Sequence, residues 1–293
     1  MSDQDAPDAK RVTPKNLLVA AGVVIATQVV ALLITSQNLP VYVSVVETTG
    51  PSYAPAGTSV AGSALNAALL VAFAFALTLI LVWLLRRRLV LPFKVFVFGS
   101  VAFSAFILTL VTAGQFAFDY LPTSFVDPVA YGVPVAVVAL IAYTIFVKNV
   151  NWVATIVLAF VGAEVGSFFA ETLPTWTALA LPIAFAVYDV YAVFKGPLKA
   201  LVGTGQGIAL IGMSIRAGEF TLGLGDVVFY TLLPSLALFQ FYHAFGALPA
   251  VLTIAAIDVG MVITLFLLSR RRLLPGLPIP MLLGVIVVLR FLV

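Results

Sequence analysis

The sequence predicts an all-helical protein that crosses a membrane nine times, with its N-terminus in the cytoplasm and its C-terminus outside. Three observations support this fold class: the composition, the length of the apolar runs and the placement of the basic residues. Of the 293 residues, 62% are hydrophobic and only 9% are charged. Soluble domains carry about 25% charged residues. The composition therefore predicts that lipid surrounds most of the chain.

The apolar runs have the length that a membrane-spanning helix needs, about 20 residues. After a polar tail, residues 1–15, the sequence predicts a single membrane domain over 16–293. Its spans are expected near 16–36, 63–85, 93–113, 128–147, 151–168, 175–195, 221–242, 247–268 and 277–293. The first run is as long as a full span and no clear cleavage site follows it, so we interpret it as a span and not a signal peptide.

The basic residues set the expected orientation, because cytoplasmic loops are rich in Lys and Arg. With Lys10, Arg11 and Lys15 placed inside, every other Lys and Arg except Arg290 also falls on the cytoplasmic side. One span more or fewer after residue 90 would move every later loop to the opposite side of the membrane. The basic residues would then be distributed over both sides. An outer loop at 37–62 and an inner loop at 196–220 join the spans. We expect an integral, multi-pass protein, located in the cell membrane if the source is prokaryotic.

Several kinds of chemistry are excluded by residue content. The chain has no cysteine and a single histidine, His243, so disulfides, thiolate catalysis and a His-rich zinc centre cannot form. We expect no metal site and no cofactor. The basic clusters flank apolar runs and are interpreted as topology signals, so no nucleic-acid partner is expected. The glycines at 203–207 lack a following Walker Lys-Ser pair and are interpreted as a flexible linker.

Two carboxylates fall inside spans at matching depths. Asp189 lies six residues before Lys195, and Asp226 lies seven residues after Glu219. At 1.5 Å per residue these positions are about 9 Å and about 10 Å from the same cytoplasmic boundary. Acids in a span are costly, and consecutive antiparallel helices are usually neighbours, so we expect the two side chains to face each other.

A facing acid pair has a defined chemistry. Two carboxyls a few ångströms apart do not both ionise easily, so they share a proton. One of them can then activate a water molecule while the other donates to a substrate carbonyl, which hydrolyses a peptide bond without a covalent intermediate. Because such a pair titrates as a unit, the acid and base roles are not assigned to individual residues.

Two further segments are expected near the pair. Gly223, Leu224 and Gly225 precede Asp226 directly, and the glycines permit a helix or an extended substrate to come close. Residues 275–280 contain three prolines, which preclude a regular helix and suggest a cavity wall or an extended segment that presents its backbone to a substrate. A helix that simply starts with proline at its first position is the alternative interpretation.

These segments together resemble the presenilin and signal peptide peptidase family of intramembrane aspartyl proteases. The resemblance rests on Tyr188-Asp189, on Gly223-Leu224-Gly225-Asp226 and on Pro275-Gly276-Leu277, where the family signature has alanine in place of glycine. It is closer to presenilin, because 187–190 continues to Lys195-Gly196-Pro197-Leu198 and Asp226 is followed by Phe229-Tyr230.

The resemblance implies a nine-helix presenilin-type bundle in which Asp189 and Asp226 are catalytic. It also implies that Tyr188, Gly223, Leu224, Gly225 and residues 275–277 bind substrate or shape the site. Single-span transmembrane proteins or peptides with their N-terminus outside are the expected substrates, and membrane lipids surround the enzyme. The short inner loop argues against self-cleavage, so we expect a single-chain enzyme that requires no protein partner.

The function expected from the sequence is hydrolysis of peptide bonds in transmembrane helices. The alternative is a proton- or ion-coupled transporter that uses the same acids. Transporter sites usually lie near the midplane and accompany internal repeats, and neither feature is found here. A non-catalytic scaffold gives no reason for two matched acids in lipid.

The remaining polar residues receive simpler interpretations. Asp258, near the middle of the eighth span, is expected to be a neutral acid bonded to a neighbouring helix, with a proton-relay role as the alternative. Glu164 lies near the outer end of the fifth span, where an interfacial position would explain it. Glu171 and His243 are assigned to outer loops.

Overall fold

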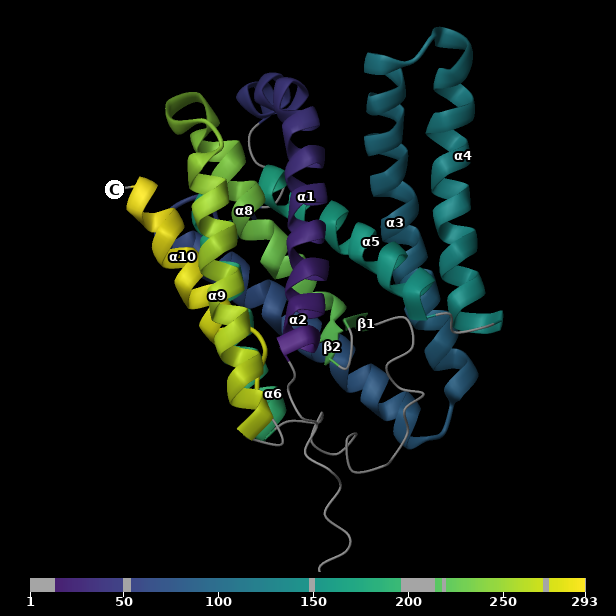
Figure 1. The fold of residues 1–293 in the computed structure, drawn as a ribbon, viewed down its shortest axis with the longest axis vertical. Helices are drawn as coiled ribbons and strands as arrows, with labels where there is room; N and C mark the ends of the chain where they lie inside the picture. Colours follow the sequence, from purple (N-terminus) through teal and green to yellow (C-terminus); the bar gives the residue numbers. More distant parts are fainter. Residues whose placement is uncertain are drawn as a thin grey trace, which may run out of the picture.

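The computed structural model describes residues 14–49, 54–147, 151–195, 214–217, 220–270 and 274–292. Within them the protein is helical apart from one short hairpin (Figure 1). The polar tail up to residue 13, the glycine-rich stretch at 203–207 and the basic residues Arg271 and Arg272 lie outside the described residues.

The helices follow the expected order of spans. They are α1 (Pro14–Thr49), α2 (Val60–Arg86), α3 (Val90–Tyr120), α4 (Thr123–Ala142) with the π-helical turn η1 (Tyr143–Val147), α5 (Asn151–Thr172), α6 (Thr175–Phe194), α8 (Leu224–Phe245), α9 (Leu248–Arg270) and α10 (Pro278–Leu292). Eight of these described helices are long and apolar enough to cross a membrane, and α10 is a shorter apolar helix. The predicted class, an integral multi-pass helical protein, is confirmed.

The N-terminal end of α1 lies at the lower end of the bundle and the C-terminus at the upper end (Figure 1). Opposite ends are what an odd number of crossings requires. The side of the membrane on which each end lies stays a prediction, because it rests on the loop charges alone.

Two features of the fold differ from the sequence expectation. The outer loop was expected to begin at residue 37, but α1 continues to Thr49. The apolar run resumes after Pro40, and a proline can be accommodated inside a helix at the loss of one hydrogen bond. The inner loop was expected to be irregular to residue 220, but β1 (Ser214–Ala217) and β2 (Phe220–Gly223) pair as an antiparallel hairpin. The seventh span therefore begins at Leu224 and not at 221.

Helix α8 lies at the centre of the bundle. Its residues from Val227 to Leu238 are all buried, and the helix packs against α5, α1 and α9. Helices α3 and α4 pack mainly against each other and stand at one side (Figure 1). Large apolar side chains such as Phe103 and Phe118 point outward from α3, as expected of surfaces that face lipid. The Asp226 helix is thus the most enclosed element.

Glycines allow the closest helix contacts, as is usual where no hydrophobic driving force between helices exists in lipid. Gly162 and Gly166 of α5 face Val227 and Thr231 of α8. The Thr231 hydroxyl donates to the Gly162 carbonyl at 3.2 Å. On α9, a Cβ added to Gly260 would lie 2.6 Å from the Cα of Pro280. The start of helix α10 is therefore in direct contact with the backbone of α9.

We predict that Gly260→Ala destabilises the protein by about 1–3 kcal/mol, the usual cost of overpacking, because the added methyl meets backbone atoms that cannot rotate away. The matched control is Gly132→Ala on α4, where a Cβ would meet nothing within 4 Å. Thermal unfolding in detergent should show a lower Tm for the first variant only. Equal Tm values for both variants would contradict the close contact between α10 and α9.

Candidate functional site

Asp189 is held by the segment that precedes α10. It lies near the C-terminal end of α6 and is half-buried. The backbone N–H of Leu277 donates a hydrogen bond to its Oδ2 oxygen at 3.1 Å, and the backbone of Gly276 interacts with the same carboxylate. Two residues 88 positions apart in the chain are thereby joined.

Asp226 lies in the first turn of α8. The N–H of Gly223, the last residue of β2, donates to its Oδ2 oxygen at 3.2 Å. A carboxylate at this position satisfies a backbone donor that would otherwise be free and interacts favourably with the positive end of the helix dipole. The hairpin and α8 are therefore joined through the Asp226 side chain.

Gly276 lies between the two carboxylates. A Cβ built on it would lie 3.2 Å from Oδ2 of Asp226, while its neighbour Leu277 donates to Asp189. The two carboxylates are also close enough to interact electrostatically. The structure thus brings together the ends of α6 and α8 and the segment before α10.

The proline-rich segment combines both interpretations that the sequence allowed. Residues 274–277 are not helical, and α10 then begins with Pro278 at its first position. Proline is favoured there because the missing N–H has no partner inside a helix anyway. The non-helical residues before it leave the Leu277 N–H free to bind Asp189. Pro275 and Leu277 are buried, which anchors the segment on both sides of Gly276.

Tyr230 is a site residue that the sequence reasoning did not single out. Its hydroxyl donates to the carbonyl oxygen of Gly276 at 3.1 Å, and its ring is fully buried. It follows Asp226 by four residues, so both lie on one face of α8. That spacing was the available signal. The segment around Gly276 is consequently bonded to both α6 and α8.

The other expected site residues differ in their surroundings. The Tyr188 hydroxyl lies 3.1 Å from Thr78 Oγ1 on α2, and its ring packs edge-on against Phe75 and Phe185. Its described contacts are thus aromatic packing and one bond to α2. Gly225 has open space where a Cβ would be, so it leaves one flank of Asp226 uncovered. Leu224 packs against the central apolar cluster.

Asp258 is connected to the site through one intermediate residue. Its side chain bonds to Gln28 of α1, which agrees with a contact to a neighbouring helix. The Gln28 amide also donates to the backbone oxygen of Tyr230 at 3.3 Å. Asp258, Gln28 and Tyr230 therefore form a polar path from α9 to the residue that binds Gly276.

The interpretation of Glu164 and Glu171 as interfacial or loop residues is wrong. Both belong to α5, and their exposed fractions are 2% and 4%. Glu164 Oε2 accepts a hydrogen bond from Thr109 of α3 at 2.8 Å. Glu171 accepts from Asn38 of α1. The helix runs to Thr172, about one turn beyond the expected end of the span at residue 168, so Glu171 lies on the helix and not in a loop.

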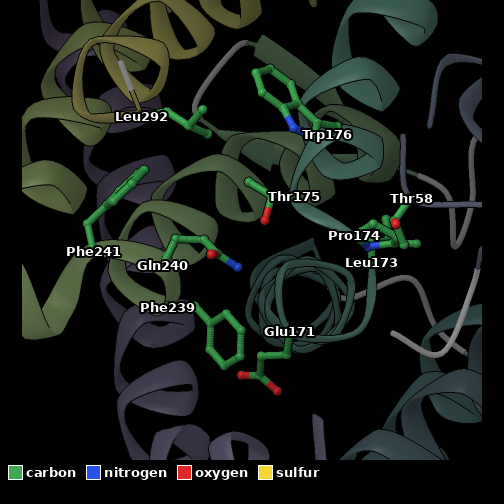
Figure 2. Close-up of a pocket in the computed structure, with 10 residues that line it drawn as sticks. All are labelled: Thr58, Glu171, Leu173, Pro174, Thr175, Trp176, Phe239, Gln240, Phe241 and Leu292. Atoms are coloured by element: carbon green, nitrogen blue, oxygen red, sulfur yellow. The ribbon is translucent and has the colours of Figure 1, made fainter. Parts of the chain in front are cut away.

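A cavity of about 450 Å³ lies away from the aspartates. Figure 2 shows Trp176 and Thr175 from the start of α6 opposite Gln240 and Phe241 from the end of α8. None of the residues that line it belongs to the group around Gly276. The candidate active site is therefore the contact between the two aspartates and the Gly276 segment, and not this cavity.

Among the residues that the structure describes, no group of three or more His, Cys, Asp or Glu side chains could hold a metal ion. The arrangement instead offers two carboxyls and several fixed backbone N–H groups. Such a group of acids can move protons to and from a bound water molecule.

Comparisons with known proteins bear on the family and the fold of the chain. The family model described as Presenilin matches residues 13–208, more than half of the chain. That range covers α1 to α6, including Asp189, and ends before Asp226. The first five expected spans all lie inside the matched range.

Individual relatives extend the comparison. Presenilin-B of Dictyostelium discoideum is 37% identical over 125 residues, which are 39% of this chain and 25% of the relative. The matched segment thus spans a quarter of that protein's length.

Two crystal forms of a presenilin family intramembrane aspartate protease share the fold. The first has a TM-score of 0.62 at 21% identity, with 94% of this chain and 97% of the other covered. The second has a TM-score of 0.60 at 23% identity, with 93% and 96% covered. At these identities the likeness establishes the presenilin-type helical bundle, and together with the family model it shows that the chain belongs to the presenilin family.

Proposed function

We propose that the chain is an intramembrane aspartyl protease whose catalytic residues are Asp189 and Asp226. The observation that carries the proposal is the position of Gly276 between the two carboxylates, with Leu277 bonded to one of them. Membership of the presenilin family and the fold shared with a presenilin family intramembrane aspartate protease support it.

Each aspartate is oriented by a backbone N–H group that donates to one of its oxygens. Oδ2 of Asp189 accepts from the Leu277 N–H and Oδ2 of Asp226 accepts from the Gly223 N–H. Fixed backbone donors hold the carboxyl groups without neutralising them. Preorganised groups of this kind spare the reaction the cost of reorientation.

In the proposed reaction the pair carries one proton. The ionised carboxylate takes a proton from water as the water oxygen bonds to the scissile carbonyl carbon, and the protonated carboxyl gives its proton to the carbonyl oxygen. The resulting diol then breaks its C–N bond. One proton passes to the departing nitrogen, and the products are a carboxyl group and an amine. The pair ends with one proton, as it began.

A substrate helix must unwind before this chemistry, because a helical backbone hides its carbonyls in hydrogen bonds. The hairpin offers a partner for the unwound strand. In an antiparallel pair with a two-residue connection, Ala217 and Phe220 form a hydrogen-bonded pair, so Arg216 and Thr221 form a non-bonded one. The N–H and C=O of Thr221 therefore point away from β1, toward the open edge of β2. An extended substrate could add to that edge three residues from the start of α8.

Single-span transmembrane proteins or peptides are the proposed substrates, with their N-terminus on the outer side. The loop charges give this chain a presenilin-like orientation, with the aspartate ends of α6 and α8 toward the cytoplasm, and the substrate orientation is inferred from it by analogy with that family. A location in the cell membrane and activity as a single chain without protein partners belong to the same proposal. No observation favours the transporter alternative.

Asp189→Asn and Asp226→Asn should each lower the rate of cleavage at least about a hundredfold, since each removes a group that transfers a proton in the reaction. The measurement uses purified protein mixed with a single-span peptide, and the fragments that are released are followed by mass spectrometry. The matched control is Asp127→Asn, an exposed acid on α4, which should cleave as the unchanged protein does. Cleavage activity that survives in either aspartate variant would contradict the assignment of Asp189 and Asp226 as the catalytic pair.

Tyr230→Phe should lower kcat about 2- to 10-fold, the effect expected from losing one hydrogen bond of 0.5–1.5 kcal/mol that positions the Gly276 segment. Tyr242→Phe, on the exposed end of α8, is the matched control and should leave kcat unchanged. The same loss of kcat in both variants would show that the bond to Gly276 has no part in the reaction.

Thr221→Pro should raise KM or abolish cleavage, because proline removes the N–H at the outer edge of β2 while leaving the ladder to β1 intact. Thr221→Ala keeps that N–H and should behave like the unchanged protein. Wild-type cleavage kinetics in the proline variant would contradict strand addition at this edge. Such a result would not contradict the proposed catalytic roles of Asp189 and Asp226.

A further inference from the structure

A second group of buried acids lies on α5, a different helix from those that carry Asp189 and Asp226. Glu164 and Glu171 are seven residues apart, which places them two turns apart on one helix face. Both are almost completely buried, and both line a cavity of about 70 Å³. The cavity is also lined by residues of α1 and α3, Asn38 and Thr112 among them. No residue of the candidate active site takes part in it.

The hydrogen bonds made to these glutamates all come from uncharged donors. Thr109 donates to Oε2 of Glu164 at 2.8 Å. The Nδ2 of Asn38 donates to both oxygens of Glu171, at 3.3 and 3.2 Å. Among the described residues that line the cavity there is no Lys or Arg. The described surroundings thus provide donors but no compensating charge.

Two oxygens at this cavity lack any partner in the described structure. They are Oε1 of Glu164 and Oδ1 of Asn38, and both are buried. Each is a hydrogen-bond acceptor, as are the carboxylate oxygens beside them. Glu171 also lines the larger neighbouring cavity, where Figure 2 shows its carboxylate turned away from Gln240 and Thr175. The two unpartnered oxygens belong to side chains that line the small cavity, and each requires a donor or a cation.

We propose that this cavity binds a small hard cation through Glu164, Glu171 and Asn38. Oxygen ligands of carboxylate and amide type are those that Na⁺ and Ca²⁺ accept, whereas softer metals select sulfur or imidazole. A buried carboxylate without a counter-charge is strongly unfavourable, and a bound cation supplies the missing charge. The cavity exceeds the about 10–15 Å³ that one water needs, so an ion has room for water ligands as well.

The site would join α1 to α5 where α3 packs against both helices. Helices α3 and α4 pack mainly on each other (Figure 1), and the seam between α3 and α1 is polar. Gln37 of α1 donates to the Thr112 carbonyl, and Gln115 donates to the Gln37 carbonyl. A cation held between Asn38, Glu164 and Glu171 lies beside these contacts and adds a bond from α5. Its occupancy would therefore stabilise the whole protein.

The test is thermal unfolding of the purified full-length protein in choline chloride, NaCl, KCl or CaCl₂ at equal ionic strength. We expect a saturable rise in Tm with Na⁺ or with Ca²⁺ relative to choline, since a ligand bound only by the folded state stabilises it. The two salts tell the monovalent from the divalent case. If no cation raises Tm above the choline value, the proposal is overturned, and the carboxyls are protonated and bridged by water.

Variants separate this site from general salt effects. Glu164→Gln should abolish the ion-specific rise, and Asp127→Asn, an exposed acid on α4, should keep it. An unchanged rise in Glu164→Gln would overturn the proposal. Should that variant fail to fold, Asn38→Ala provides the same comparison, and equilibrium binding of radioactive Na⁺ or Ca²⁺ to the unchanged protein must show saturable uptake. None of these readouts depends on proteolysis.

Discussion

The hydrogen bond from the Leu277 N–H to Asp189 is the interaction on which the candidate site depends. It joins the end of α6 to the segment before α10, and that segment in turn rests on Asp226 and is bonded by Tyr230. A regular helix through residues 274–277 would consume the Leu277 N–H internally. The prolines that prevent such a helix therefore make the site possible. Glycine at 276 then permits the segment to lie against the Asp226 carboxylate, where a Cβ would be tightly placed.

A backbone hydrogen bond also holds Asp226, the second carboxylate of the pair. Asp226 lies in the first turn of α8 and binds the last residue of β2, so the hairpin position and the carboxylate orientation are coupled. A substrate strand that added to β2 would lie next to the catalytic oxygens in the proposed reaction. The buried centre of α8 keeps this helix start rigid, because its neighbours pack against it on several sides.

Much of this could be predicted from the sequence, for physical reasons. Span length and loop charge are strong signals in lipid, so the order of the helices followed from counting residues. The hairpin did not, since strands of only four residues leave little periodic pattern. Glu164 and Glu171 were misplaced because an acid near the end of an apolar run usually indicates an interface. The hydrogen bonds of Thr109 and Asn38 that hold them inside depend on tertiary packing. Tyr230 was overlooked because its role arises from a contact with residue 276, 46 positions away.

The most direct test of the account is the location of the peptide bond that the purified protein cuts in a single-span substrate. The account predicts that the bond lies within the apolar segment, because Asp189 and Asp226 are on membrane-spanning helices and Gly276 lies between them. Mass spectrometry of the fragments gives that position. Cuts confined to the polar residues that flank the segment, or no cut by a folded protein, would contradict the proposal that this pair of carboxylates hydrolyses transmembrane helices.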